Sequence, residues 1–137
     1  MSTMRLSWGF DPGPKARAEH LAAPTWADVE DKLARLAAAH TGSIKLELQP
    51  APTLGPQSLQ AIAENGTYLV MLGEMIEVDG DVDHNVRTLY DASATPGKTL
   101  IMGDFWDARQ TSREPAVVRD VFKDFFETGD VSADKLS

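Results

Sequence analysis

The chain has 137 residues, of which 42% are hydrophobic, with no cysteine and a net charge of −8. This length fits one domain, expected over residues 1–137, and the lack of cysteine excludes disulfide bonds, thiolate metal sites and cysteine nucleophiles. No stretch approaches the roughly 20 apolar residues of a membrane span, and residues 1–10 lack a secretion-signal pattern, so we expect a soluble cytoplasmic protein.

The acidic residues are distributed unevenly along the chain. Residues 1–68 contain six basic and seven acidic residues, whereas residues 69–137 contain seven basic and fourteen acidic residues. The acidic half would repel phosphates, so we expect neither nucleic acid nor a membrane as partner. It would attract a cationic protein and accelerate the encounter with it. The alternative interpretation is that the charge only keeps a small protein soluble.

The N-terminal third of the chain predicts a strand and a helix. Residues 3–9 alternate between apolar and polar side chains, as a strand does, and the Asp-Pro-Gly-Pro turn at 11–14 follows. A loop is expected next. Thr25 is a good helix N-cap, and apolar residues at helical spacing extend from there to Leu36. Gly42 is expected to end this helix in the left-handed conformation.

The middle of the chain predicts five further strands. They are expected at residues 43–49, 58–64, 67–73, 86–91 and 98–103. Asn65-Gly66 is typical of a two-residue hairpin turn, because both residues must adopt positive φ. The segment 74–85 is expected to be an acidic loop, and the last two strands are expected to pair with each other.

A second helix is predicted near the C-terminus. Pro115 lies in its first turn, an apolar face extends from Val117 to Phe126, and Gly129 ends it. The order of elements predicts an α+β fold in which two helices cover a mainly antiparallel sheet of about five or six strands.

Five acidic residues and no basic residue occupy positions 74–83. They are Glu74, Glu77, Asp79, Asp81 and Asp83. On a hairpin rim such carboxylates repel each other modestly, by about 1 kcal/mol at about 4 Å in water, and a cationic partner would relieve this repulsion. We therefore predict that they contact the partner, in a pattern similar to the charges of a phosphate backbone. A solvated acidic loop is the alternative.

A second predicted contact segment contains two aromatic residues between two carboxylates, Asp104-Phe105-Trp106-Asp107. Tryptophan is frequent at the energetic centres of interfaces, so we predict that Asp104, Trp106 and Asp107 contact the partner. The alternative is that Trp106 is a core residue with acids beside it on the surface. Arg87 and Arg109 could pair with nearby acids and hold the two acidic segments in place.

The sequence offers little support for catalysis or for a cofactor. His20, His40 and His84 are far apart, and glycine-rich phosphate loops and a Gly-x-Ser-x-Gly motif are absent. Residues 79–83 are similar to the first half of a calcium-binding loop. However, His84 and Tyr90 occupy the positions at which that loop requires glycine and a bidentate glutamate. We expect no metal, no cofactor and no catalytic residues.

Four segments carry a resemblance to a known family. They read Glu-Asn-Gly-Thr-Tyr at 64–68, Val-Arg-Thr-Leu-Tyr at 86–90, Gly-Asp-Phe-Trp-Asp-Ala-Arg at 103–109 and Phe-Phe-Glu-Thr-Gly-Asp-Val-Ser at 125–132. These segments resemble a family of small bacterial proteins of undefined function. That family is similar in size and pattern to immunity proteins encoded beside contact-dependent or other polymorphic toxins.

The resemblance implies a non-catalytic protein that binds a cognate toxin in the cytoplasm and blocks its active site or its access to substrate. Such toxins are often cationic nucleases, which would suit the acidic half of this chain. Two other functions stay open: a small enzyme that uses carboxylates or a metal ion, and a structural subunit that forms a homodimer through a sheet edge.

Overall fold

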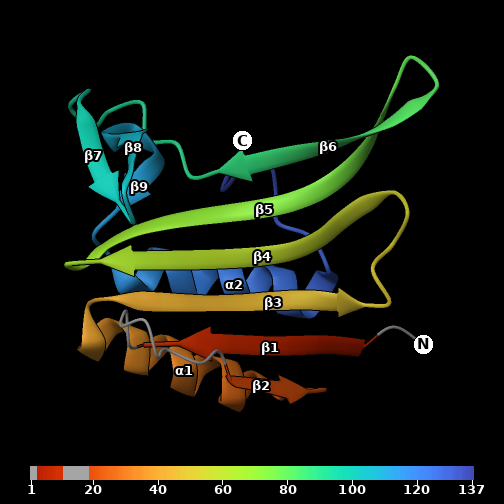
Figure 1. The fold of residues 1–137 in the computed structure, drawn as a ribbon, viewed down its shortest axis with the longest axis horizontal. Coiled ribbons are helices and arrows are strands. Elements are labelled where there is room, and N and C mark those ends of the chain that lie inside the picture. The colour runs from red at the N-terminus through yellow and green to blue at the C-terminus, as the bar shows by residue number, and fades with distance from the viewer. Residues whose placement is uncertain (1–2, 11–18) are drawn as a thin grey trace.

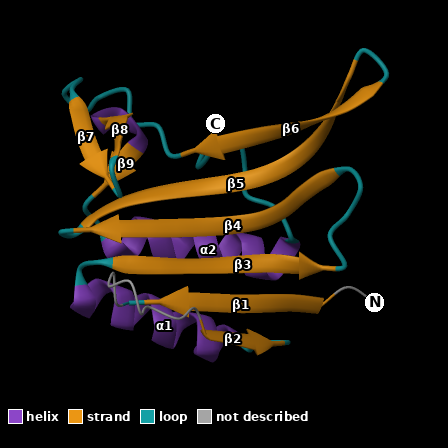
Figure 2. Ribbon diagram, viewed as in Figure 1, coloured by secondary structure: helices purple, strands orange, loops and turns teal. Residues whose placement is uncertain are grey.

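Two helices cover one face of an antiparallel sheet in the computed structural model, which describes residues 3–10 and 19–137 (Figure 1 and Figure 2). The strands are β1 (Thr3–Gly9), β2 (Glu19–Ala22), β3 (Gly42–Gln49), β4 (Gly55–Glu64), β5 (Thr67–Val78), β6 (Asp81–Thr88), β7 (Lys98–Ile101), β8 (Asp104–Asp107) and β9 (Thr111–Ser112). The helices are α1 (Trp26–Ala39) and α2 (Pro115–Thr128), and a 3-10 turn, η1 (Ala108–Gln110), precedes β9.

The main sheet has the strand order β2-β1-β3-β4-β5-β6, and β9 pairs with the first residues of β5. Strands β7 and β8 form a separate hairpin. All these pairs are antiparallel. The predicted α+β class, with two helices on a mainly antiparallel sheet, is confirmed.

Helix α1 begins at the predicted cap and ends differently from the prediction. Thr25 N donates to Asp28 Oδ2 at 2.8 Å, and Asp28 N donates to Thr25 Oγ1 at 3.2 Å, which forms a capping box. The left-handed residue that ends the helix is His40, with φ 65°, so the prediction of Gly42 is wrong. Gly42 instead starts β3, where a Cβ atom would lie 2.5 Å from the carbonyl oxygen of Gly9.

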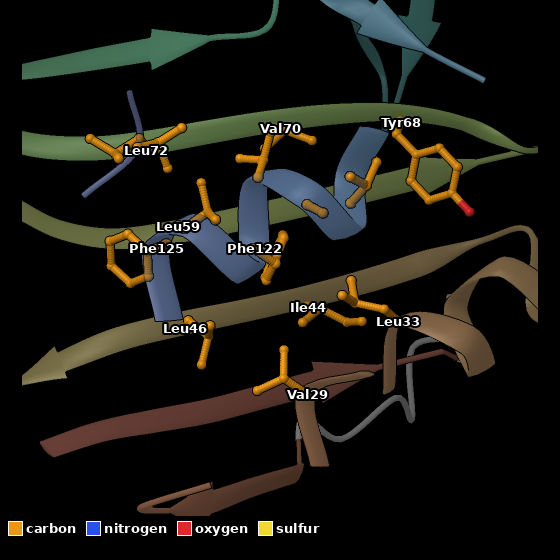
Figure 3. Packing of buried hydrophobic residues seen from close by; sticks show 14 of the residues in the cluster. Val29, Leu33, Ile44, Leu46, Leu59, Tyr68, Val70, Leu72, Phe122 and Phe125 are labelled. Carbon is orange, nitrogen blue, oxygen red and sulfur yellow. The ribbon is translucent and has the colours of Figure 1, made fainter. Parts of the chain in front are cut away.

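The hydrophobic core lies between the helices and the sheet (Figure 3). Phe122 and Phe125 of α2 are fully buried, and so are the inward residues Ile44, Leu46 and Leu59 of β3 and β4. Each such side chain contributes about 1.5–3 kcal/mol to stability relative to an exposed position.

No helix of the described residues is long and apolar enough to cross a bilayer.

The segment 74–85 is a β-hairpin, so the prediction of an acidic loop there is wrong. Strand β5 continues to Val78, and β6 begins at Asp81. Asp79 and Gly80 join them with φ of 51° and 86°, the two positive values of a tight hairpin turn. The acidic residues do not prevent pairing, because four of them keep their side chains in solvent and Glu74 pairs with Arg87. The predicted pairing of 86–91 with 98–103 is also wrong, since β6 pairs with β5 and β7 pairs with β8.

Strand β2 lies in a segment that was expected to be a loop. It pairs with β1, and all four of its residues are exposed. A strand without a buried face lacks the apolar alternation that identifies strands in a sequence. The turn predicted at residues 11–14 lies outside the described residues.

The last residues of the chain, 130–137, return to the sheet beside β6; we call them the C-terminal segment. Its residues Val131 and Leu136 are buried. Ser137 exchanges two backbone hydrogen bonds with Thr88, each 3.0 Å long. The guanidinium of Arg87 donates to the carbonyl oxygen of Val131 at 3.0 Å and also pairs with Asp130. Arg87 therefore fastens the C-terminal segment to the end of β6.

Candidate functional site

The outer part of the β5–β6 hairpin carries four of the predicted contact residues. In Figure 1 this hairpin projects beyond the other strands. Strand β4 pairs with β5 only as far as Met75, so the outer residues of β5 pair with β6 alone. Glu77, Asp79, Asp81 and Asp83 are exposed in this region, and we call them the hairpin carboxylates.

The hairpin carboxylates point in several directions. Their register places Asp81 and Asp83 on the sheet face that the helices cover elsewhere, Glu77 on the opposite face, and Asp79 in the turn. None of the ion pairs in residues 3–10 and 19–137 includes any of the four. Their charges therefore lie around the rim of the hairpin, where water is their main source of stabilisation.

Exposed valines also lie on this hairpin: Val78 and Val82 are between the hairpin carboxylates in sequence, and Val86 follows on β6 after Asp83. Val78, Val82 and Val86 have 46%, 54% and 45% of their surface exposed. Val82 and Val86 share the face of Glu77, because they occupy alternate positions of β6. The outer hairpin is thus a mixed surface of apolar and negatively charged groups.

Glu74, the fifth predicted acid, is held by neighbouring side chains of the sheet and is mostly covered. Its side chain is only 14% exposed, and its Oε2 lies 3.4 Å from Nε of Arg87, without hydrogen-bond geometry. The same oxygen accepts a hydrogen bond of 2.9 Å from the side chain of Asn85. The idea that Arg87 pairs with a nearby acid is confirmed, and Glu74 is largely covered by this pairing.

Asp107 of the second predicted segment is also engaged within the protein, by Arg109. Its carboxylate accepts hydrogen bonds from Nη2 of Arg109 at 2.7 Å and from the backbone N of Arg109 at 2.9 Å. These bonds lower the pKa of Asp107 from 3.8 to about 2. The pairing of Arg109 with a nearby acid is therefore confirmed, and it fixes the turn that leads from β8 into η1.

We expect Asp107→Asn to lower the melting temperature at neutral pH, because the neutral amide loses the charged pair with Arg109. A lowered pKa stabilises the fold above the ordinary value of 3.8, and this contribution is lost as the pH falls through about 2. Thermal unfolding of the variant and the wild type should thus differ at pH 7 and converge near pH 2. Asp104→Asn, at an exposed position, is the control. An equal difference at both pH values would contradict the assignment.

The β7–β8 hairpin presents Phe105 to solvent and keeps Trp106 half-buried. Phe105 is 69% exposed, and its cross-strand partner Leu100 is 52% exposed. Met102 in the turn is 46% exposed, and its backbone N donates to Glu64 Oε2 at 2.6 Å, which attaches this hairpin to β4. The sequence prediction named Trp106 as a contact residue and did not name Phe105, the more exposed of the two aromatic residues. Strand alternation was the available signal, since a half-buried Trp106 requires Phe105 to point outward.

The two predicted contact segments do not form one surface. The β7–β8 hairpin and β9 lie at the start of β5, whereas the hairpin carboxylates surround its other end (Figure 1). Leu69 of β5 pairs with β9, and Asp79 lies in the turn that follows β5. At about 3.3 Å per residue, the strand between them covers about 33 Å. A partner that covers the hairpin carboxylates would need to be large to reach Asp104 as well.

A hollow of about 490 Å³ lies between the end of β6, the segment after β8, the start of α2 and the C-terminal segment. Its lining includes Tyr90, Arg109, Arg113 and Lys135. The three basic side chains of this lining have protein partners. Arg109 pairs with Asp107, and Arg113 donates to Thr67 Oγ1 at 3.2 Å. Lys135 lies 3.5 Å from a carboxylate oxygen of α2. No group of three or more potential metal ligands occurs among the described residues.

Comparison with known proteins assigns the chain to a family. Residues 6–135 match the model of the family of unknown function DUF6911. The chain belongs to DUF6911. This confirms the resemblance to a family of undefined function. The DUF6911 chain is also similar to a solved hypothetical protein from Neisseria gonorrhoeae, with 18% identity, a TM-score of 0.78, and coverage of 96% of this chain and 92% of that chain. This similarity supports the fold. No curated protein matches the chain.

Proposed function

We propose that this DUF6911 protein binds a cationic protein through its outer β5–β6 hairpin and thereby blocks the partner's functional surface. The observation that carries the proposal is the group of four exposed carboxylates that lack an intramolecular ion pair in the described chain. A cationic partner would replace their mutual repulsion with attraction and would be drawn to the hairpin from a distance.

The apolar part of the same surface favours a protein over a small cation as the partner. Val82 is about half exposed and lies directly opposite Glu77, and Val86, also about half exposed, follows on the same face of β6. A calcium ion requires six to eight oxygen ligands that converge on one point. The hairpin carboxylates diverge around a strand pair, so they suit a surface that wraps around the hairpin.

An immunity-type role in the cytoplasm is the specific form of this proposal. The net charge of −8 suits a basic toxin, including a toxin that acts on nucleic acid. An acidic hairpin that projects from the sheet can occupy the cleft in which such a toxin binds phosphates. In this role the protein has no catalytic residues, and inhibition follows from occupancy alone.

Co-expression with a basic toxin-like domain encoded beside the gene tests the proposal. The expected result is a stable complex that elutes as one species and that has lost the toxic activity of the free domain. A complex in which the hairpin carboxylates stay accessible to solvent, or a catalytic turnover that depends on them, would overturn the proposal. Hydrogen exchange of the complex and of the free protein identifies the covered strands.

A further inference from the structure

Among the described residues, the outer edge of β6 has no partner strand before Thr88. The strand order places β6 at the end of the sheet. The backbone N–H and C=O of Thr88 bind Ser137, so they point away from β5. Because these groups alternate in direction along a strand, the backbone groups of Val82, His84 and Val86 point the same way. The described part of the chain provides no backbone partner for these three residues.

This edge is shielded at one position and open beside it. The N–H of His84 donates to Oδ1 of Asp83 at 2.9 Å, so an adjacent side chain occupies that donor. Within residues 3–10 and 19–137 no such group covers Val82 or Val86, whose side chains are 54% and 45% exposed. Ser137 shows how the edge can be used, because it pairs with Thr88 through both backbone hydrogen bonds of an antiparallel pair.

We propose that the β6 edge binds an extended segment of the cationic partner as an additional strand of the sheet. The inference rests on the proposed function, since it states how that partner is held. Residues directly opposite each other in paired strands lie on the same face. An added strand would therefore place alternate residues beside Asp81 and Asp83 on one face and beside Val82 and Val86 on the other. The matching segment alternates basic and apolar residues.

Charge selects this occupant over a second copy of the chain. A second copy would bring its own hairpin carboxylates and a further net charge of −8 to the shared edge. Charged residues on an edge strand are a common protection against pairing between identical edges. The same carboxylates attract a basic segment, which gains main-chain hydrogen bonds from the edge and contacts with the valines.

The first test uses two synthetic peptides of nine residues with the same composition of lysine and valine. One alternates the two residue types, and the other places all lysines before all valines. Titration calorimetry at low salt should show tighter binding of the alternating peptide. N-methylation of alternate amides should weaken its binding at least about fivefold when the methylated side faces β6, since each lost hydrogen bond contributes about 1 kcal/mol. Methylation of the other set should leave binding unchanged.

The second test changes the protein edge. Val86→Pro removes a donor that points away from β5, a position at which an edge strand tolerates proline. Val86→Thr, which keeps the N–H and the branched shape, is the matched control. We expect the proline variant to bind the alternating peptide at least about fivefold more weakly than the threonine variant does. Circular dichroism and urea unfolding check that both variants are folded, and the methylated peptides test the edge independently of folding.

Several outcomes would overturn this inference. In the peptide titrations, these are equal binding of the two sequences, no binding of either, and no effect of N-methylation on either side. In sedimentation, it is a dimer of the protein that the Val86→Pro substitution dissociates. Equal binding that still depends on the hairpin carboxylates would refute strand addition and leave the proposed function standing. A co-expressed basic partner whose binding does not depend on those carboxylates would refute the proposed function itself.

Discussion

Conversion of all four hairpin carboxylates to amides should slow association with the cationic partner about tenfold or more at low salt. Oppositely charged surfaces raise association rates by factors of about 10 to 1,000, and this effect declines as salt screens it. The variant should therefore also lose most of the salt dependence of the association rate. Stopped-flow measurement between low and physiological salt checks both effects. The fold should persist, because the four side chains are exposed and have no ion pairs in the described chain.

A control variant with the same net charge separates local from overall electrostatics. It removes four acids that are exposed away from the hairpin: Glu19, Asp31, Glu114 and Asp120. At physiological salt we expect this variant to retain most of the association rate, because exposed charges beyond a Debye length of about 8 Å then contribute little. Equal rates for the two variants would show that only the net charge matters, and the hairpin would lose its assigned role.

Arg87→Met should reduce the free energy of unfolding by about 3–5 kcal/mol, because it leaves a largely covered charge without its partner. The side chains of Arg87 and Glu74 are 16% and 14% exposed, and their charged atoms lie 3.4 Å apart. The substitution also removes the hydrogen bond to the carbonyl oxygen of Val131, which holds the C-terminal segment against the sheet. Urea unfolding at pH 7 measures the loss.

Two further variants show whether the uncompensated charge is the cause. The double variant Glu74→Met with Arg87→Met should recover part of the lost stability, since both charges are then absent. Arg113→Met is the matched control at an exposed arginine whose side chain donates to Thr67. It should cost less than about 1 kcal/mol. Equal losses for Arg87→Met and Arg113→Met would contradict the assigned role of Arg87.

The elements that depend on local sequence could be predicted. The capping box at Thr25, the turn at Asn65-Gly66 and the glycine that ends α2 all occur where the sequence places them. In each case a few adjacent residues determine the backbone conformation. The Asp79-Gly80 turn carries an equally strong local signal. The acidic residues around this turn instead favour the prediction of a loop, and that prediction is wrong.

The elements that depend on distant residues could not be predicted. Strand β2 has no buried face, so only its pairing with β1 defines it. Glu74 and the hairpin carboxylates look alike in the sequence. They differ in the structure because Arg87 covers Glu74, whereas the others lie beyond Gly55, the first residue of β4. Whether a carboxylate is structural or available to a partner depends on such tertiary contacts.

The pairing of Ser137 with Thr88 affects how the protein can be labelled. In an antiparallel pair, any residue fused after Ser137 would start opposite Arg87 and continue along β6 toward Val86. A C-terminal affinity tag would thus be a tethered competitor for this edge, with an effective concentration on the order of millimolar. Histidine or lysine residues in the tag would also attract the carboxylates of the hairpin. A tag placed before β1 would not extend the pairing of Ser137 along β6.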